Sequence, residues 1–158
     1  MKKIIIGFTL LPFMAWSQSN VHFSHTVETS ASPEAIWAIW TDVPNWKQWD
    51  DGLKDAAVDG VFKKGAQGKL TPDKGPTSKF VISELEEGKS YTFKTRIPFG
   101  WLIVQRRLKV ENHLTYFTHE VQFTGLFKKA LGNSFGKRYR TKLPVVMEKI
   151  KSLAESKS

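Results

Sequence analysis

The sequence predicts an α+β fold in which a curved antiparallel sheet of about six to seven strands wraps around one long C-terminal helix. Stretches of alternating apolar and polar residues follow one another on short turns through the middle of the chain, which is typical of an antiparallel meander. Two short tryptophan-rich helical segments come before them. An apolar spacing of three or four residues covers the end of the chain and predicts the long helix.

Residues 1–17 are expected to be a signal peptide rather than part of the fold. The chain starts with two lysines, continues with the mainly apolar run 4–16, and ends that run with A-W-S at Ser17. We expect cleavage before Gln18 and export to the periplasm or out of the cell. The alternative is an uncleaved membrane anchor, although the run is shorter than the ~20 residues that span a bilayer.

Residues 18–158 are expected to form a single domain, since their number is typical of one domain. The chain has no cysteine, which excludes disulfides, thiolate catalysis and cysteine metal sites. Its four histidines show no metal-ligand spacing, and no nucleotide-binding or nucleophile motif is present. We therefore expect neither a metal nor a cofactor.

The domain opens with an expected strand at 21–29, in which apolar and polar residues alternate. Ser32 is suited to cap the helix that follows, and Pro33 fits its first position. Pro44 then restarts the chain as a second short helix. Each helix carries two tryptophans spaced by three residues, which places both on one face. Such helices need a large apolar surface to pack against.

The strands and the long helix follow in order. The strands are expected at 53–62, 67–70, 78–86, 89–97, 101–110 and 115–123. The helix is expected from about 126 to 154, with a bend or a looser segment because Gly132, Gly136 and Pro144 lie inside it.

Four motifs in this order resemble a known family. They are S-P-E-x-I-W at 32–37, T-D-x-x-x-W-x-x-W at 41–49, E-L-E-E-G-K at 84–89 and T-H-E-V-x-F-x-G at 118–125. Together they resemble the START-like, or SRPBCC, superfamily and its polyketide cyclase/dehydrase-like group over nearly all of the predicted domain. The resemblance implies a helix-grip fold with a deep hydrophobic cavity under the C-terminal helix. It does not imply one function, because members include lipid and hormone binders, aromatic-polyketide cyclases and quinone-binding proteins.

The last hairpin places a polar pair on an apolar face. With a two-residue loop at 112–113, Arg106 faces His119, and Leu108 faces Phe117 on the same side. A short turn at 98–100 would set Tyr91 beside Arg106 and Phe93 one step away on the same face.

Extending the pairing by one more strand brings Glu84 into a polar row with Tyr91, Arg106 and His119. Arg106 would anchor an anionic ligand end, and His119 would orient it or move a proton. The alternative is that Arg106 pairs with Glu84 or His119 in a purely structural role, with its guanidinium reaching water.

Tryptophans are the best apolar candidates for lining a cavity. Trp46 and Trp49 are expected to lie near the cavity mouth, although filling the core is the usual role of such residues. The expected ligand-binding set is therefore Arg106, His119, Glu84, Tyr91, Trp46, Trp49, Phe93 and Phe117. Asp50 and Asp51 resemble paired carboxylates but are expected to cap the second helix or to be solvated.

The net charge of +9 is concentrated near the start of the long helix. This basic segment is a candidate for contact with an anionic membrane, and the alternative is a solvated helix face. Nucleic acid would meet the same charge, but export argues against that partner. The basic residues are Lys128, Lys129, Lys137, Arg138, Arg140 and Lys142.

These observations favour an exported protein that holds a lipid-like, quinone-like or aromatic molecule between the sheet and the C-terminal helix. An enzyme of the polyketide cyclase or dehydratase type is the alternative, with acid–base residues in the cavity. It is less favoured, because no recognised catalytic motif is present. A third hypothesis is an interaction module whose cavity is closed by aromatic side chains.

Overall fold

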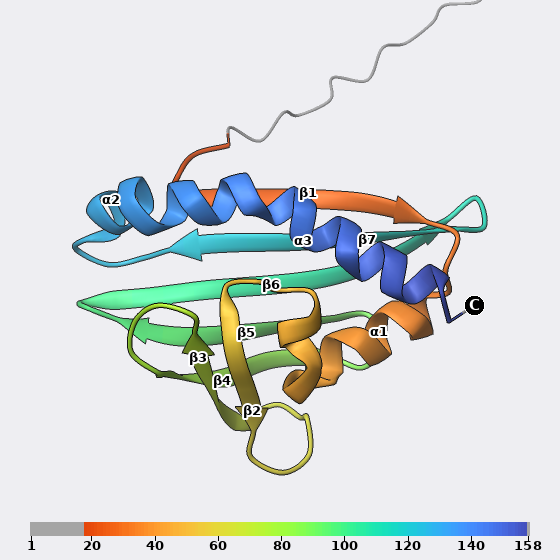
Figure 1. Cartoon of the computed structure of the whole chain (residues 1–158), viewed down its shortest axis with the longest axis horizontal. Helices are drawn as coiled ribbons and strands as arrows, with labels where there is room; N and C mark the ends of the chain where they lie inside the picture. The colour runs from red at the N-terminus through yellow and green to blue at the C-terminus, as the bar shows by residue number, and fades with distance from the viewer. Residues whose placement is uncertain (1–17, 158) are drawn as a thin grey trace, which may run out of the picture.

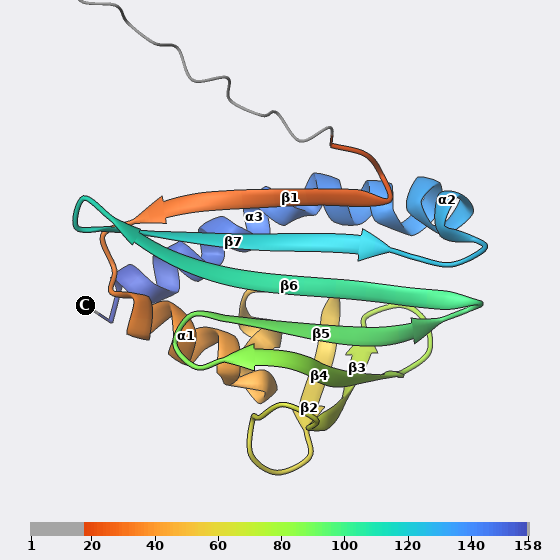
Figure 2. The ribbon, with the colours of Figure 1, turned by 180° about the vertical axis from the view of Figure 1, so that it is seen from behind.

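A computed structural model describes residues 18–157 and shows one antiparallel sheet crossed on one face by a long C-terminal helix (Figure 1). The view from behind shows the other face of the sheet with no helix over it (Figure 2). The strands are β1 His22–Thr29, β2 Leu53–Val58, β3 Gln67–Pro72, β4 Ser78–Glu86, β5 Ser90–Ile97, β6 Gly100–Glu111 and β7 Leu114–Phe123. The predicted helix-grip fold is confirmed.

The sheet is a meander with one strand added at its edge. Its seven strands lie in the order β1-β7-β6-β5-β4-β3-β2, so β2 to β7 follow one another and β1 pairs with β7. The turn between β6 and β7 has Asn112 and His113 at positive φ, 51° and 63°, as a two-residue hairpin loop requires. The predicted register of this hairpin is confirmed, with Arg106 opposite His119.

Two short helices connect β1 to β2, as the sequence predicts. In α1, Pro33–Thr41, Ser32 Oγ accepts a hydrogen bond from the N–H of Ala35 at 3.2 Å. The second helix, η1, Val43–Gln48, is a 3₁₀ helix. Trp46 Nε1 donates to the carbonyl oxygen of Trp40 at 2.9 Å, which ties the two helices together.

The C-terminal helix is continuous but changes its winding. α2, Lys128–Leu131, leads into the π-helical segment η2, Gly132–Gly136, and then into α3, Lys137–Glu155. A Cβ at Gly136 would lie 2.1 Å from the carbonyl oxygen of Asn20, so glycine is needed for the helix to approach the chain before β1. The predicted irregularity lies at the two glycines, whereas Pro144 lies inside α3.

The core lies between the concave face of the sheet and the inward faces of α1, η1 and α3. Leu143, Met147, Ile150 and Ala154 of α3 are buried there together with three of the tryptophans. Among the helices of residues 18–157, none combines the length and the apolar character needed to cross a bilayer. The predicted signal peptide, residues 1–17, lies outside the described residues.

Candidate ligand-binding site

Arg106 is the centre of the candidate site. It lies in the middle of β6, pairs with Tyr91 of β5 on one side and with His119 of β7 on the other, and is only 2% exposed. The backbone register alone explains this, because residues opposite one another in a sheet point to the same face. This part of the row is therefore predicted correctly from the sequence.

Four aromatic rings surround the guanidinium group of Arg106. Its Cζ lies 4.6 Å from the ring centroid of Trp46, 4.9 Å from Trp49, 5.5 Å from Tyr91 and 5.6 Å from Phe93. These distances are typical of cation–π contacts, which stabilise a charge that has left water. The four rings were predicted as site residues for their apolar or polar character, and the structure brings all of them to the same group.

The guanidinium is charged and largely unpaired. Arg106 Nη1 donates a hydrogen bond to the hydroxyl oxygen of Tyr91, and that hydroxyl donates to the carbonyl oxygen of Trp40 at 3.0 Å. Arg106 Nε is buried and has no hydrogen-bond partner. Within residues 18–157, no carboxylate lies within ion-pair distance of Arg106. Burial, opposed by the charge of Arg106, raises the pKa of Tyr91 to about 12.

His119 extends the polar row toward the C-terminal helix. Its Nε2 lies 3.0 Å from the hydroxyl oxygen of Tyr139 of α3, and its buried Nδ1 has no hydrogen-bond partner. Burial and the charge of Arg106 hold the pKa of His119 well below its usual range, so the imidazole is neutral at pH 7. Burial also raises the pKa of Tyr139, and this hydroxyl is neutral as well.

Asp50 is a neighbour of Arg106 that the sequence analysis assigns only to capping or solvent. Its Oδ1 does accept the N–H of Gly52 at 2.9 Å, as a capping residue would. Burial nevertheless raises the pKa of Asp50, against the opposing influence of that N–H and of the charge of Arg106. Asp51 differs, because it is exposed and pairs with Lys149 of α3 at 2.5 Å. Both Asp50 and Tyr139 reach the site through tertiary packing.

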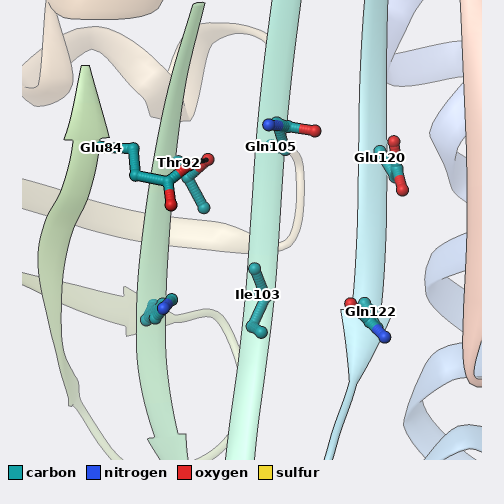
Figure 3. A pocket seen from close by; sticks show the side chains of 7 residues that line it. Glu84, Thr92, Ile103, Gln105, Glu120 and Gln122 are labelled. Atoms are coloured by element: carbon teal, nitrogen blue, oxygen red, sulfur yellow. Dashed lines mark hydrogen bonds between the residues drawn. The ribbon is translucent and has the colours of Figure 1, made fainter.

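Glu84 does not belong to the row, and this prediction is wrong. The pairing of β4 with β5 shifts between Ile82 and Glu84, which turns Glu84 to the outer face of the sheet. There its Oε2 accepts a hydrogen bond from Thr92 Oγ1 at 3.3 Å. An outer hollow of about 240 Å³ lies there. Figure 3 shows Glu84 at one side of it, next to Thr92 of β5, with Gln105 of β6 and Glu120 of β7 further across the sheet.

The interior beside Arg106 is filled with aromatic rings in this structure. Trp46 packs on Phe93 with ring centroids 5.6 Å apart and on Trp49 at 5.9 Å, and Phe117 is fully buried against Trp40 at 6.1 Å. The four apolar residues predicted to line a cavity, Trp46, Trp49, Phe93 and Phe117, are buried in the core of this structure, and their contact with a ligand stays a prediction. Apart from the outer hollow, a second open hollow of about 400 Å³ lies at the start of α3, outside this core. Within residues 18–157, no cluster of His, Asp or Glu is suited to a metal ion.

The sequence profile of a family described as polyketide cyclase / dehydrase and lipid transport matches residues 20–150. The chain belongs to this family. Its resemblance to the SRPBCC superfamily, predicted from four motifs, is therefore confirmed. Among curated protein sequences, none matches this chain.

Solved structures show the same fold at low identity. A START superfamily protein from Mycobacterium smegmatis is 14% identical with a TM-score of 0.68, covering 87% of this chain and 99% of the other. One part of the di-domain ARO/CYC protein StfQ from the steffimycin biosynthetic pathway is 12% identical with a TM-score of 0.68, covering 87% of this chain and 51% of that protein. The Aha1 dimer from Colwellia psychrerythraea is 19% identical with a TM-score of 0.66, covering 85% and 96%.

Proposed function

We propose that this protein binds a mostly apolar small molecule that carries an acidic end, and that Arg106 holds the acid. The observation that carries the proposal is the buried guanidinium, which has an unpartnered Nε and no carboxylate within ion-pair distance among the described residues. A buried charge costs several kcal/mol unless it is paired. A ligand carboxylate would supply that pair as a charge-assisted, bidentate contact, and a phenolate would supply it through its single oxygen.

The surroundings of Arg106 favour a ligand with an apolar body. Rings of tryptophan, tyrosine and phenylalanine lie against the guanidinium, the acidic neighbour Asp50 is beyond ion-pair distance, and membership of the family supports a hydrophobic ligand. His119 is neutral and its Nδ1 is free, so it offers a further hydrogen bond to the same ligand end. Fatty acids and aromatic acids combine both properties.

Entry to Arg106 requires a movement of η1. This helix alone separates Arg106 from solvent on its side of the core. Its outward residues, including Asn45 and Lys47, are exposed, while Trp46 on its inward face contacts the guanidinium. Asp42, the residue before η1, accepts a hydrogen bond from the exposed side chain of Asn45 at 2.8 Å but makes no side-chain capping bond to the backbone of the helix. Displacement of η1 with the rings of Trp46 and Trp49 would open a space directly beside Arg106.

The proposal is tested by comparing an acid with its alcohol. We expect dodecanoate and 2-naphthoate to quench tryptophan fluorescence with saturation, and dodecanol and 2-naphthalenemethanol to bind at least about tenfold more weakly. Arg106→Met should remove the difference between acid and alcohol, whereas Arg107→Met, on the exposed outer face, should keep it. Equal binding of acid and alcohol, or an unchanged preference in Arg106→Met, would overturn the proposal.

A second candidate function is catalysis of the cyclase or dehydratase type, and His119 is the observation that favours it. In the tautomer that carries its proton on Nε2 and donates it to the Tyr139 hydroxyl, the imidazole is oriented and Nδ1 has a lone pair that can accept a proton. Burial and the charge of Arg106 lower the pKa of His119, so an anionic substrate group beside Arg106 would be needed to make it a better base. Mass spectrometry of a bound polyketide-like substrate would detect loss of water. This function requires that His119→Gln abolish turnover while binding persists.

We also infer that the protein acts outside the cytoplasm. The support is the signal-type sequence at residues 1–17. Fractionation of the native host should recover a chain that begins at Gln18 in the periplasm or medium, and a full-length cytoplasmic chain would refute the inference.

A further inference from the structure

Three large apolar side chains are exposed together at one end of the sheet. Phe99 lies in the turn between β5 and β6 and is 75% exposed, while Leu126 and Phe127 lie in the loop between β7 and α2 and are 78% and 45% exposed. Both loops lie at the same end of the molecule, on the left in Figure 1. We call these three residues the apolar tip. Exposed apolar groups gathered in this way mark contact surfaces.

Close backbone packing and hydrogen bonds join the two loops of the apolar tip. Gly100 and Gly125 let the two loops approach so closely that a Cβ at either would lie 2.0 Å from a carbonyl oxygen of the other loop. Leu126 N donates to Phe99 O at 3.2 Å, and Thr124 N donates to Trp101 O at 2.8 Å. The backbone that carries the three exposed side chains is therefore held in place.

Phe99 adopts a backbone conformation that its side chain does not favour. Its φ is 56°, a region that bulky residues rarely occupy. Its ring packs edge-on against Phe127 with centroids 5.3 Å apart, and both rings remain open to solvent. Pro98 and Phe99 form a two-residue turn whose second position needs a positive φ, and glycine or asparagine would adopt it with less strain. An exposed phenylalanine at this position benefits neither folding nor solubility, which supports a role in contact with a partner.

Positive charge lies next to the apolar tip. Lys128 and Lys129 follow it directly, at the N-terminal end of the C-terminal helix, where a lysine is unfavourable to the helix dipole. On the adjacent strand, the guanidinium of Arg96 lies 4.7 Å over the ring of Trp101. No acidic residue occurs in the sequence from 121 to 147. This charge distribution does not serve helix stability and instead complements an anionic surface.

We propose that the apolar tip docks on an anionic lipid bilayer. Phe99, Leu126 and Phe127 enter the boundary between headgroups and acyl chains, and Lys128 and Lys129 contact lipid phosphates. Short apolar insertion combined with a basic rim is the physical basis of peripheral membrane binding. This places membrane contact at the loops rather than along the whole basic helix, and it does not depend on a ligand at Arg106.

The test is flotation of the chain that begins at Gln18 with vesicles of phosphatidylcholine alone or with 30% phosphatidylglycerol. This chain contains every described strand and helix. We expect retention by the anionic vesicles at low salt, with weaker retention by the neutral ones and at high salt. The triple variant Phe99→Asn, Leu126→Ser, Phe127→Ser should reduce retention at least about tenfold. Asparagine tolerates the positive φ at position 99.

A matched control exists at the loop between β2 and β3. Val61 is 74% exposed there and is followed by Lys63 and Lys64, so the loop has similar exposure and charge. The variant Val61→Ser, Lys63→Glu, Lys64→Glu should retain wild-type binding, whereas Lys128→Glu, Lys129→Glu should lose it. The proposal would be overturned if the variants of the β2–β3 loop lost as much vesicle retention as those of the apolar tip and its lysines. Unchanged retention of the triple variant, or self-association of the protein without vesicle binding, would also overturn it. Circular dichroism confirms that every variant scored is folded.

Discussion

Replacing Arg106 by methionine separates a ligand-binding arginine from a structural one. If Arg106 exists to hold a ligand, the empty protein carries its buried charge at a cost, and Arg106→Met removes that cost. The variant should then be as stable as the wild type or more stable, while losing its preference for acidic ligands. If Arg106 holds the core together, the same substitution should destabilise the protein.

The magnitude follows from the contacts of the guanidinium. The substitution removes one charged hydrogen bond to Tyr91, worth about 1.5–3 kcal/mol, and cation–π contacts worth about 2 kcal/mol in total. It also removes the penalty of burying an ion, which is several kcal/mol, and adds an apolar side chain worth about 1.5–3 kcal/mol. Tyr91 keeps its bond to the carbonyl oxygen of Trp40. We therefore expect a free energy of unfolding between about 0 and 2 kcal/mol above that of the wild type.

Urea unfolding followed by tryptophan fluorescence measures this difference, since Trp46 and Trp49 adjoin the site. Each kcal/mol corresponds to a shift of about 2–4 °C in Tm for a domain of this size. Arg107→Met is the control, because Arg107 is exposed and pairs with Glu120 at 2.8 Å on the outer face. A loss of more than about 1 kcal/mol in Arg106→Met, beyond that of the control, would refute the reasoning.

Three further predictions concern stability. Because the folded protein lowers the pKa of His119, only the unfolded chain binds a proton on this residue as the pH falls below ~6.5. The free energy of unfolding should therefore decrease as the pH is lowered, by up to about 1.4 kcal/mol per pH unit. His119→Gln should flatten this slope in urea titrations between pH 7 and 5, and an unchanged slope would contradict the argument. Gly125→Ala should lower the free energy of unfolding by at least about 1–3 kcal/mol, because φ is +92° and the new Cβ would meet a carbonyl oxygen; an unchanged urea midpoint would contradict this. Met147→Ala, in the core, should cost about 2–5 kcal/mol in thermal or urea unfolding, whereas exposed Val145→Ala should cost less than about 0.5 kcal/mol, and equal costs would refute the packing argument.

Much of the site could be predicted because a strand has a period of two and a hairpin has a countable loop. Once Asn112 and His113 form a two-residue turn, Arg106 must face His119, and parity places both on the apolar side. Tyr91 follows by the same argument on the next strand. Local information was sufficient for these positions.

Glu84 shows where such counting fails. One irregularity between Ile82 and Glu84 reverses every later side chain of β4, and nothing in the local sequence marks it. The positions of Asp50 and Tyr139 near Arg106 could not be predicted for another reason. They depend on how η1 and α3 pack on the sheet, which involves residues far apart in the chain.

Spacing along the chain was enough to predict the order of strands and helices, the family and the pair Arg106–His119. The tertiary structure was needed to show that four rings enclose the guanidinium and fill the space beside it, because ring placement depends on packing between distant segments. It also decided that Phe99 and Phe127 meet in one apolar tip. Two glycines bring their loops together there, and no local pattern records that approach.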